Sequence, residues 1–180
     1  MGAKTRALSR VWHDSISLWT HVLKIDPQNA IALLDLSQAY IDAGEMDKAL
    51  ADINTGEELE PENPKFCNNR GIIYFKRGEY DKALNEFNRS LAINPRFQLG
   101  YLNRAILWGH LHEFEKSIHD LTAAIEINKY FYLAYYYRGI AYKELNLADR
   151  ALADFKAAYK ISPTETARRE IESLSSQKNP

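Results

Sequence analysis

The feature that most constrains this chain is a repeat with a fixed period of 34 residues. The period runs through the prolines, the small residues and the large apolar residues, and its aromatic members are Tyr40, Tyr74, Trp108 and Tyr142. Its small members are Ala49, Ala83, Ser117 and Ala151, and its large apolar members are Ile53, Phe87, Leu121 and Phe155. A period of about 20 to 50 residues is typical of a solenoid, because each unit can bury its apolar face only against its neighbours. The repeat therefore predicts a solenoid, ahead of any local propensity.

Within one period, the stretch from residue 66 to residue 95 predicts two short amphipathic helices joined by a turn at Gly78. Gly71 is small enough to let the two helices approach each other closely. Ala83 and Phe87 lie four residues apart on the second helix, so they share a face. Pro95 ends that helix, because it has no backbone N–H to donate and clashes with the preceding turn. The repeating unit is therefore a helix pair, and the fold class is all-α.

On these residues the chain resembles the tetratricopeptide repeat (TPR) family. The residues of the best-fitting copy that stand at the family's positions are Gly71, Tyr74, Ala83, Phe87 and Pro95. Cys67 and Arg70 depart from the family pattern, which often has Trp and Leu there. The resemblance extends over residues 12–174 and implies a right-handed α-solenoid of stacked antiparallel helix pairs, the TPR superhelix.

The register predicts six segments. Residues 1–29 form an N-terminal half-repeat with the second helix only, and residues 166–180 form a C-terminal capping helix with a frayed tail. Four complete repeats occupy residues 30–63, 64–97, 98–131 and 132–165. The third repeat departs most, because Ala105, His112 and Lys129 replace the first-helix glycine, the turn glycine and the proline. We expect a looser turn at His112, with the repeat itself retained.

Composition excludes several classes of function. The net charge of −1 gives no overall attraction to nucleic acid or to an anionic membrane, so neither is expected as a direct partner. The single cysteine rules out an internal disulfide and any cysteine-rich zinc site. The sequence has no run of 18 apolar residues and no visible secretory signal, so we expect the chain to be soluble as given. The cellular compartment stays unknown.

The sequence offers no support for catalysis. The five histidines do not form a set of metal ligands, and Cys67 stands at a core position, where a buried, inert thiol is expected. There is no glycine-rich phosphate loop and no pair of acids beyond surface charge. We therefore expect no enzymatic activity, no cofactor and no metal.

The family resemblance implies a concave groove lined by the first helix of each repeat, and a scaffold that binds an extended peptide or partner segment there. The residues predicted to line this peptide-binding groove are Asp35, Gln38, Asn68, Asn69, Ile72, Lys76, Asn103, Ile106, His110, Tyr136, Tyr137 and Ile140. An asparagine side chain can both donate to and accept from a peptide backbone, and tyrosine offers a large contact area with few rotatable bonds. The alternatives are an asparagine that merely tolerates solvent and tyrosines that pack between repeats.

One known mode of peptide binding in the family does not fit. Some TPR domains hold the C-terminal carboxylate of heat-shock chaperones with a clamp of lysine, asparagine and arginine side chains. Here the corresponding positions include Leu34, Gln38, Leu133 and Tyr137. The chain is therefore not expected to form that carboxylate clamp.

Arginines also follow the period, at Arg70, Arg104 and Arg138, and the second helices carry acids at the same interval. We expect each arginine to meet an acid across its helix pair or from the next one. A guanidinium group that binds a carboxylate through two hydrogen bonds would fix the register of the helices. The alternative is a row of arginines that binds an anion.

The N-terminal half-repeat carries Trp12 and Trp19, which leaves two further hypotheses. The first is a possible homodimer formed through these two tryptophans. The second follows from a resemblance of residues 10–19 to the segment that joins a membrane domain to its TPR tail in some glycosyltransferase-like proteins. It implies a soluble, acceptor-recruiting or regulatory tail of a larger membrane protein. The sequence identifies neither the ligand nor the oligomeric state.

Overall fold

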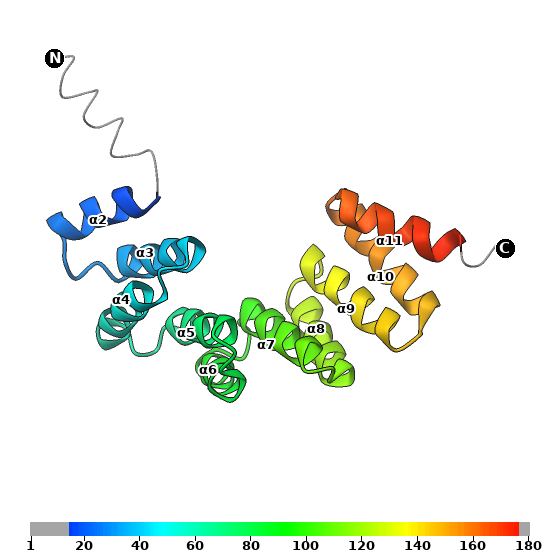
Figure 1. Cartoon of the computed structure of the whole chain (residues 1–180), viewed down its shortest axis with the longest axis horizontal. Helices are drawn as coiled ribbons and strands as arrows, with labels where there is room; N and C mark the ends of the chain where they lie inside the picture. Colours follow the sequence, from blue (N-terminus) through cyan, green and yellow to red (C-terminus); the bar gives the residue numbers. More distant parts are fainter. Residues whose placement is uncertain (1–14, 177–180) are drawn as a thin grey trace, which may run out of the picture. The chain divides into compact units, whose positions relative to one another are not determined.

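The computed structural model describes residues 15–176, which form ten helices and no strand within that range (Figure 1). The helices are α2 (Ser15–Ile25), α3 (Ala30–Ala43), α4 (Met46–Leu59), α5 (Pro64–Lys76), α6 (Tyr80–Ile93), α7 (Gln98–His110), α8 (Phe114–Ile127), α9 (Tyr132–Glu144), α10 (Ala148–Ile161) and α11 (Glu165–Ser176). The predicted all-α solenoid class is confirmed. We call α3, α5, α7 and α9 the first helices, and α4, α6, α8 and α10 the second helices. The exact repeat boundaries remain a prediction.

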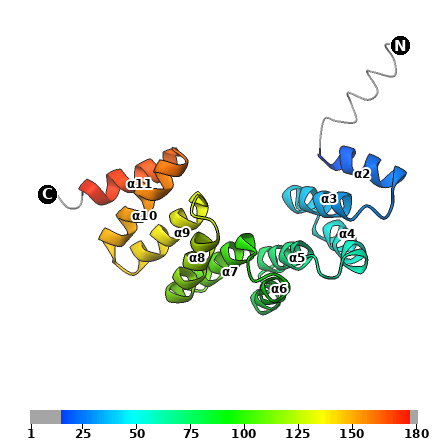
Figure 2. The same cartoon turned by 180° about the vertical axis from the view of Figure 1, so that it is seen from behind.

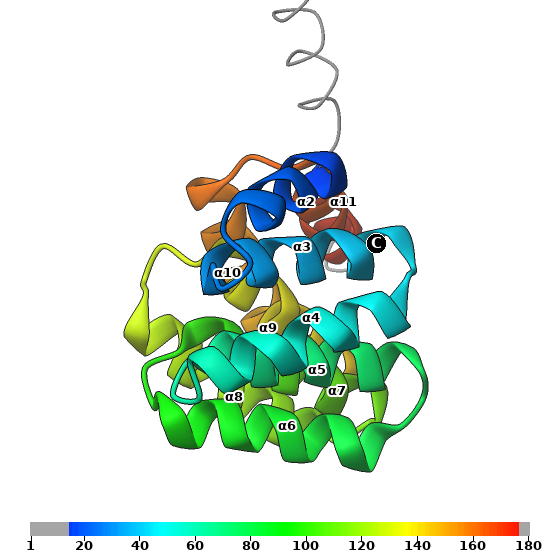
Figure 3. The same cartoon turned by 90° about the vertical axis from the view of Figure 1, so that its left-hand side faces the viewer.

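The helices group into two units, the first ending at Ile93 and the second beginning at Asn94. In unit 1, α2 packs on α3, and the pairs α3–α4 and α5–α6 stack through α4 and α5 (Figure 3). In unit 2, the pairs α7–α8 and α9–α10 stack through α8 and α9, and α11 covers α10 (Figure 2). First helices also contact each other inside each unit, α3 with α5 and α7 with α9. Each unit therefore presents a face built from two first helices.

Asparagine side chains hold the connections between helix pairs. Asn29 and Asn63 cap α3 and α5, and accept hydrogen bonds from the backbone N–H groups of Ala32 (2.9 Å) and Lys65 (3.1 Å). In the connection before α9, the side chain of Asn128 accepts from the backbone N–H of Tyr130 at 3.0 Å. That turn therefore keeps a side-chain hydrogen bond although Lys129 replaces the repeating proline.

The turn inside each helix pair is the same in all four pairs, which corrects the expectation of a looser turn at His112. Gly44 and Gly78 have φ angles of 80° and 76°, and His112 and Asn146 adopt the same left-handed conformation at 60° and 59°. The residue after each of them donates its N–H to the carbonyl oxygen five residues earlier, at 2.8 to 2.9 Å. For a residue other than glycine this conformation costs about 1 kcal/mol or more. The hydrogen bond and the packed pair hold the turn closed in spite of that penalty.

Size complementarity holds the two helices of a pair together. A Cβ atom at Gly71 would lie 2.6 Å from the Phe87 ring, and one at Gly139 would lie 2.8 Å from the Phe155 ring. In the third repeat the small residue is Ala105, and the facing large residue is Leu121 instead of phenylalanine. The extra methyl of Ala105 is therefore matched by a smaller partner. This explains why the departure at Ala105 leaves the pair intact.

This complementarity predicts the outcome of a double-mutant cycle in the fourth repeat. Gly139→Ala alone should lower the free energy of unfolding by about 2 kcal/mol, because the new methyl overlaps the Phe155 ring. Phe155→Leu alone should lower it by about 1 kcal/mol through the cavity it leaves. The double variant reproduces the Ala105–Leu121 combination and should be more stable than Gly139→Ala alone. Urea unfolding followed by circular dichroism measures all three, and losses that simply add would contradict the complementarity.

Candidate functional site

The face of α3 and α5 in unit 1 is mostly polar, and its own contacts occupy much of it. Gln38 is partly buried and donates a hydrogen bond to the Asp42 carboxylate at 3.0 Å, one turn along the same helix. Asp35 is partly buried, and Lys76 is exposed at the end of α5. Ile72 is partly buried against the apolar cluster of this unit. Of the predicted groove residues in unit 1, Lys76 is the one that the structure leaves open to solvent.

Asn68 and Asn69 are not open to solvent, contrary to the expectation from the sequence. Asn68 is 4% exposed and Asn69 is 6% exposed. The amide of Asn69 donates to the Ser37 hydroxyl at 3.4 Å, and the amide of Asn68 donates to the Asn69 side-chain oxygen at 3.4 Å. The physical reason is that α3 packs against α5 and covers this position. The Asn69 amide therefore joins two first helices, and both amides would have to leave these partners to bind a peptide.

The face of α7 and α9 in unit 2 is more apolar and more open. Ile106, Tyr137 and Ile140 are partly buried, as is Asn103, and His110 is exposed. Tyr137 and Ile106 pack at the edge of the apolar cluster that contains Leu102, Ala105 and Leu121. This face brings together the predicted residues from the third and fourth repeats.

Tyr136 packs against α10 and α11. Its ring lies 5.6 Å from the Phe155 ring, and Tyr136 and Ile171 of α11 both pack against a second apolar cluster, made of Ala151, Phe155 and Leu174. Burial raises the pKa of the Tyr136 hydroxyl, and the nearby Glu170 carboxylate adds to the rise. The structure thus gives Tyr136 a packing role between α9, α10 and α11, as the alternative for the tyrosines proposed.

A hollow of about 360 Å³ is lined by residues of α7 and α9 together with the α7–α8 turn and the start of α8. Its lining residues are Ala105, Ile106, Gly109, His110, His112, Phe114, Ser117, Tyr137, Ile140, Ala141 and Glu144. Four of these, namely Ile106, His110, Tyr137 and Ile140, belong to the residues predicted from the sequence. The hollow therefore brings together the groove residues predicted in unit 2, except Asn103 and Tyr136.

Gly109 lines the hollow without a side chain to occupy it, and the reasoning from the sequence overlooked this residue. A Cβ atom placed on Gly109 would meet only the Ser117 hydroxyl oxygen, at 3.9 Å. At the same position of the period the other repeats carry Ile41, Phe75 and Lys143. A glycine near the end of a helix, where every other copy has a long side chain, was the signal available in the sequence.

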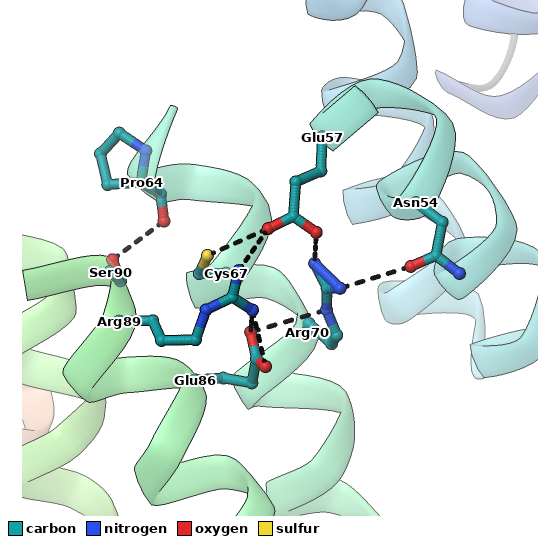
Figure 4. A network of polar contacts seen from close by, with 8 residues as sticks. All are labelled: Asn54, Glu57, Pro64, Cys67, Arg70, Glu86, Arg89 and Ser90. Carbon is teal, nitrogen blue, oxygen red and sulfur yellow. Dashed lines mark hydrogen bonds and ion pairs between the residues drawn. The ribbon is translucent and has the colours of Figure 1, made fainter. Parts of the chain in front are cut away.

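A polar network in unit 1 joins α4, α5 and α6, and it is structural (Figure 4). Arg89 donates to both oxygens of Glu86 at 3.0 Å and to Glu57 at 2.9 Å, and Arg70 donates to Glu57 from the other side. The thiol of Cys67 lies 3.5 Å from a Glu57 oxygen and is fully buried. Burial raises the pKa of this thiol to about 11, so the thiol is protonated at neutral pH. These contacts agree with the expectation of a buried, inert cysteine.

The arginines of the third and fourth repeats pair with acids across their own helix pairs, which confirms the expected register contacts. Arg104 donates to both carboxylate oxygens of Asp120 at 2.7 Å. Arg138 donates to both oxygens of Asp154 at 2.7 and 2.9 Å. The hydrogen bonds to Asp120 raise the pKa of the Arg104 guanidinium. Because these ion pairs occupy the arginines, the alternative of an anion-binding row loses its donors.

The first repeat lacks this pair, because Leu36 stands at the arginine position. Its acid, Asp52, keeps one buried carboxylate oxygen without a hydrogen-bond partner among the described residues. Burial raises the pKa of the Asp52 carboxyl from 3.8 to about 6. Asp52 therefore lacks the arginine partner that the other repeats supply, and its half-buried charge lowers the free energy of unfolding at neutral pH.

Two asparagine substitutions should consequently have opposite effects. The raised pKa means that the folded state binds more protons than the unfolded state between about pH 4 and 6, so the contribution of Asp52 to stability falls as pH rises through this range. Asp52→Asn should stabilise the protein by about 1 kcal/mol at pH 7, since solvent partly screens a carboxyl that is only half-buried, and the gain should vanish below about pH 4.

The matched control is Asp154→Asn, which replaces one of the two oxygens that accept from Arg138 with an NH2 group, removes the negative charge of the ion pair and should destabilise the protein by about 2 kcal/mol at pH 7. Urea unfolding at pH 4 and pH 7 measures both variants. An Asp52→Asn variant that is less stable than the parent at pH 7 would show that this carboxylate has a favourable partner.

Two properties of the described part of the chain bear on function. Within residues 15–176, no three His, Cys, Asp or Glu side chains lie close enough together to hold a metal ion. None of the helices in that range combines the length and the apolar character that crossing a membrane requires.

The two hypotheses about the N-terminal half-repeat involve Trp12 and Trp19, of which the structure describes Trp19. Trp12 lies outside the described residues, and Trp19 is partly buried on α2, which packs on α3. The homodimer through Trp12 and Trp19 and the membrane-protein tail both stay predictions.

Comparisons with known proteins agree with this architecture. Three family models, each described as tetratricopeptide repeat, match residues 12–66, 64–97 and 110–166. No curated protein matches the chain at a significant level. None of the comparisons shows the glycosyltransferase-like resemblance of the N-terminal segment.

Several solved structures are similar to this chain. A thermophilic TPR protein from Thermus thermophilus is 22% identical with a TM-score of 0.79, and the match covers 96% of this chain and 94% of that one. A crystal structure of MamA is 27% identical with a TM-score of 0.65, covering 82% and 86% of the two chains. The first TPR domain of Spaghetti (RPAP3), in a structure bound to an HSP90 peptide, is 24% identical with a TM-score of 0.63, covering 66% and 95%.

Proposed function

The chain belongs to the tetratricopeptide repeat family, and on that premise we propose that it is a non-enzymatic scaffold that binds an extended segment of a partner protein on the α7 and α9 face. The observation that carries the proposal is the hollow between these two first helices. Its walls are apolar and include Ile106, Tyr137 and Ile140, and polar side chains such as His110 and Glu144 join them in the lining. Apolar walls with a few polar groups are typical of binding sites that take a side chain or a small ligand.

The rest of the structure supports the choice of this face. The arginines at the inner positions are tied to acids, and the asparagines of unit 1 are tied to Ser37 and to each other. These polar groups are already satisfied inside the stack, so they contribute stability in place of ligand contacts. The α7 and α9 face combines partly exposed apolar side chains with a concave surface.

The ligand differs in chemistry from a chaperone carboxylate. The RPAP3 domain shares the fold with this chain, and its structure holds an HSP90 peptide. At the positions that would supply a carboxylate clamp this chain carries Leu34, Leu133 and Tyr137. We therefore expect recognition through an inserted side chain and not through a terminal carboxylate.

Peptide display against the full chain tests this proposal. Random peptides selected on the parent protein should lose at least tenfold in affinity for the double variant Ile106→Ala, Tyr137→Ala, because both side chains form walls of the hollow. The matched control is Glu126→Ala, Lys156→Ala, which changes two exposed side chains on the second helices and should bind as the parent does.

Thermal unfolding must show that both double variants remain folded at the temperature of the assay. Selected peptides that bind the wall variant as well as the parent, or that fail to bind only the control variant, would contradict the proposed face.

A further inference from the structure

The second repeat carries an aromatic side chain at the position where the third repeat has Gly109. Near the end of α5, the Phe75 ring lies 6.0 Å from the Tyr80 ring at an angle of 47°. One period later the corresponding residues are Gly109 and Phe114. The aromatic residue on the second helix is kept, and its aromatic partner on the first helix is absent. The third repeat therefore retains one half of an aromatic pair.

The space beside Gly109 is suited to the missing ring. A Cβ atom there would have a single neighbour within 4 Å, so nothing from the described chain fills the position. Phe114 lines the hollow and makes an edge contact with the His112 ring at 5.7 Å. An aromatic side chain is a large apolar group, and aromatic rings prefer tilted or edge contacts at centroid distances of about 4.5 to 7 Å. A ring inserted from outside could make with Phe114 the contact that Phe75 makes with Tyr80.

The charge at the mouth of the hollow favours one kind of residue beside the inserted aromatic residue of the partner segment. Among the residues that line the hollow, Glu144 is the one formally charged side chain when histidine is counted as neutral, and it is exposed. The neighbouring cation, Lys143, donates to Glu170 at 2.7 Å and so turns toward α11. The mouth is therefore acidic, and complementary charge favours a lysine or arginine in the partner.

From these three observations we propose that the hollow is an anchor site for an aromatic side chain that is adjacent to a basic residue in the partner segment. Gly109 determines this specificity, because an aromatic side chain at that position, such as Phe75 in the second repeat, would occupy the hollow from within. The inference rests on the proposed function, since it names the chemistry of the segment bound on the same face. It assigns the ring contact to Phe114 and the contact with the basic residue to Glu144.

The direct test is an NMR titration of the full, ¹⁵N-labelled chain with small probes. The three probes are the blocked dipeptides N-acetyl-Phe-Lys-amide, N-acetyl-Phe-Glu-amide and N-acetyl-Ala-Lys-amide. The Phe-Lys probe should cause saturable shifts at the amides of Gly109, Phe114 and Ala141. The Phe-Glu probe should bind about threefold more weakly, in line with an exposed charge contact, and the Ala-Lys probe should cause no saturable shift.

Three variants sharpen the test. Gly109→Phe should reduce binding of the Phe-Lys probe at least tenfold, because its own ring occupies the hollow, and should keep or raise the thermal midpoint. Gly109→Ala is the control, since its methyl enters open space and should change the affinity less than threefold. Glu144→Gln should remove the difference between the Phe-Lys and Phe-Glu probes without abolishing binding.

The outcomes separate this inference from the proposed function. Equal binding of the Ala-Lys and Phe-Lys probes, or Phe-Lys binding that survives in folded Gly109→Phe, would overturn the anchor site. If Gly109→Phe does not fold, the parent and Glu144→Gln still decide. Probe shifts outside the hollow, equal affinity of the parent for the Phe-Lys and Phe-Glu probes, or a charge preference that survives in Glu144→Gln would overturn the anchor site. A further combination is that displayed peptides lose affinity for the Ile106→Ala, Tyr137→Ala variant while the dipeptide probes cause no saturable shift in the hollow. That combination would support the proposed function and overturn the anchor site.

Discussion

The rest of the structure depends on the close contact between the two helices of each pair, where a small residue on the first helix faces a large one on the second. The facing residues are Gly71 and Phe87, Ala105 and Leu121, and Gly139 and Phe155. Because the apolar surface of a pair is buried against its own partner and against the next pair, the outer side of each first helix is not needed for the core. On the proposed function, this surplus surface is where the chain binds a partner without giving up stability.

The repeat made most of the fold predictable, because the contacts that close one pair lie within a single period. The helix pairs and the pairing of Arg104 with Asp120 follow from residues 34 positions apart that keep their type. The turn at His112 was wrongly expected to be loose, since propensity at one residue was outweighed by the packing on both sides of it. The site was less predictable. Asn69 is buried by a neighbouring helix, and the hollow at Gly109 arises from an absent side chain, which residue-type reasoning does not register.

Departures from the repeat carry the individual properties of this protein. Leu36 replaces an arginine and leaves Asp52 as a half-buried carboxylate without its usual partner, which lowers stability at neutral pH. Gly109 replaces a long side chain and opens an apolar hollow beside Phe114. The first change removes an ion pair that the other repeats make, and the second removes an aromatic contact that the second repeat makes. The first change only lowers the stability of the fold, whereas the second leaves a hollow that, on our proposal, a side chain of the partner fills.

The central claim is that the first-helix face of unit 2 stays open while the interior of each pair is closed. Paramagnetic relaxation by a soluble, uncharged gadolinium complex, measured on side-chain methyl groups, tests it most directly. The account predicts strong relaxation of the Ile106 and Ile140 methyls in the hollow and little relaxation of the buried Leu107 and Leu121 methyls. Ile106 and Ile140 methyls as protected as that of Leu121 would contradict it, because the face would then be covered by the protein itself.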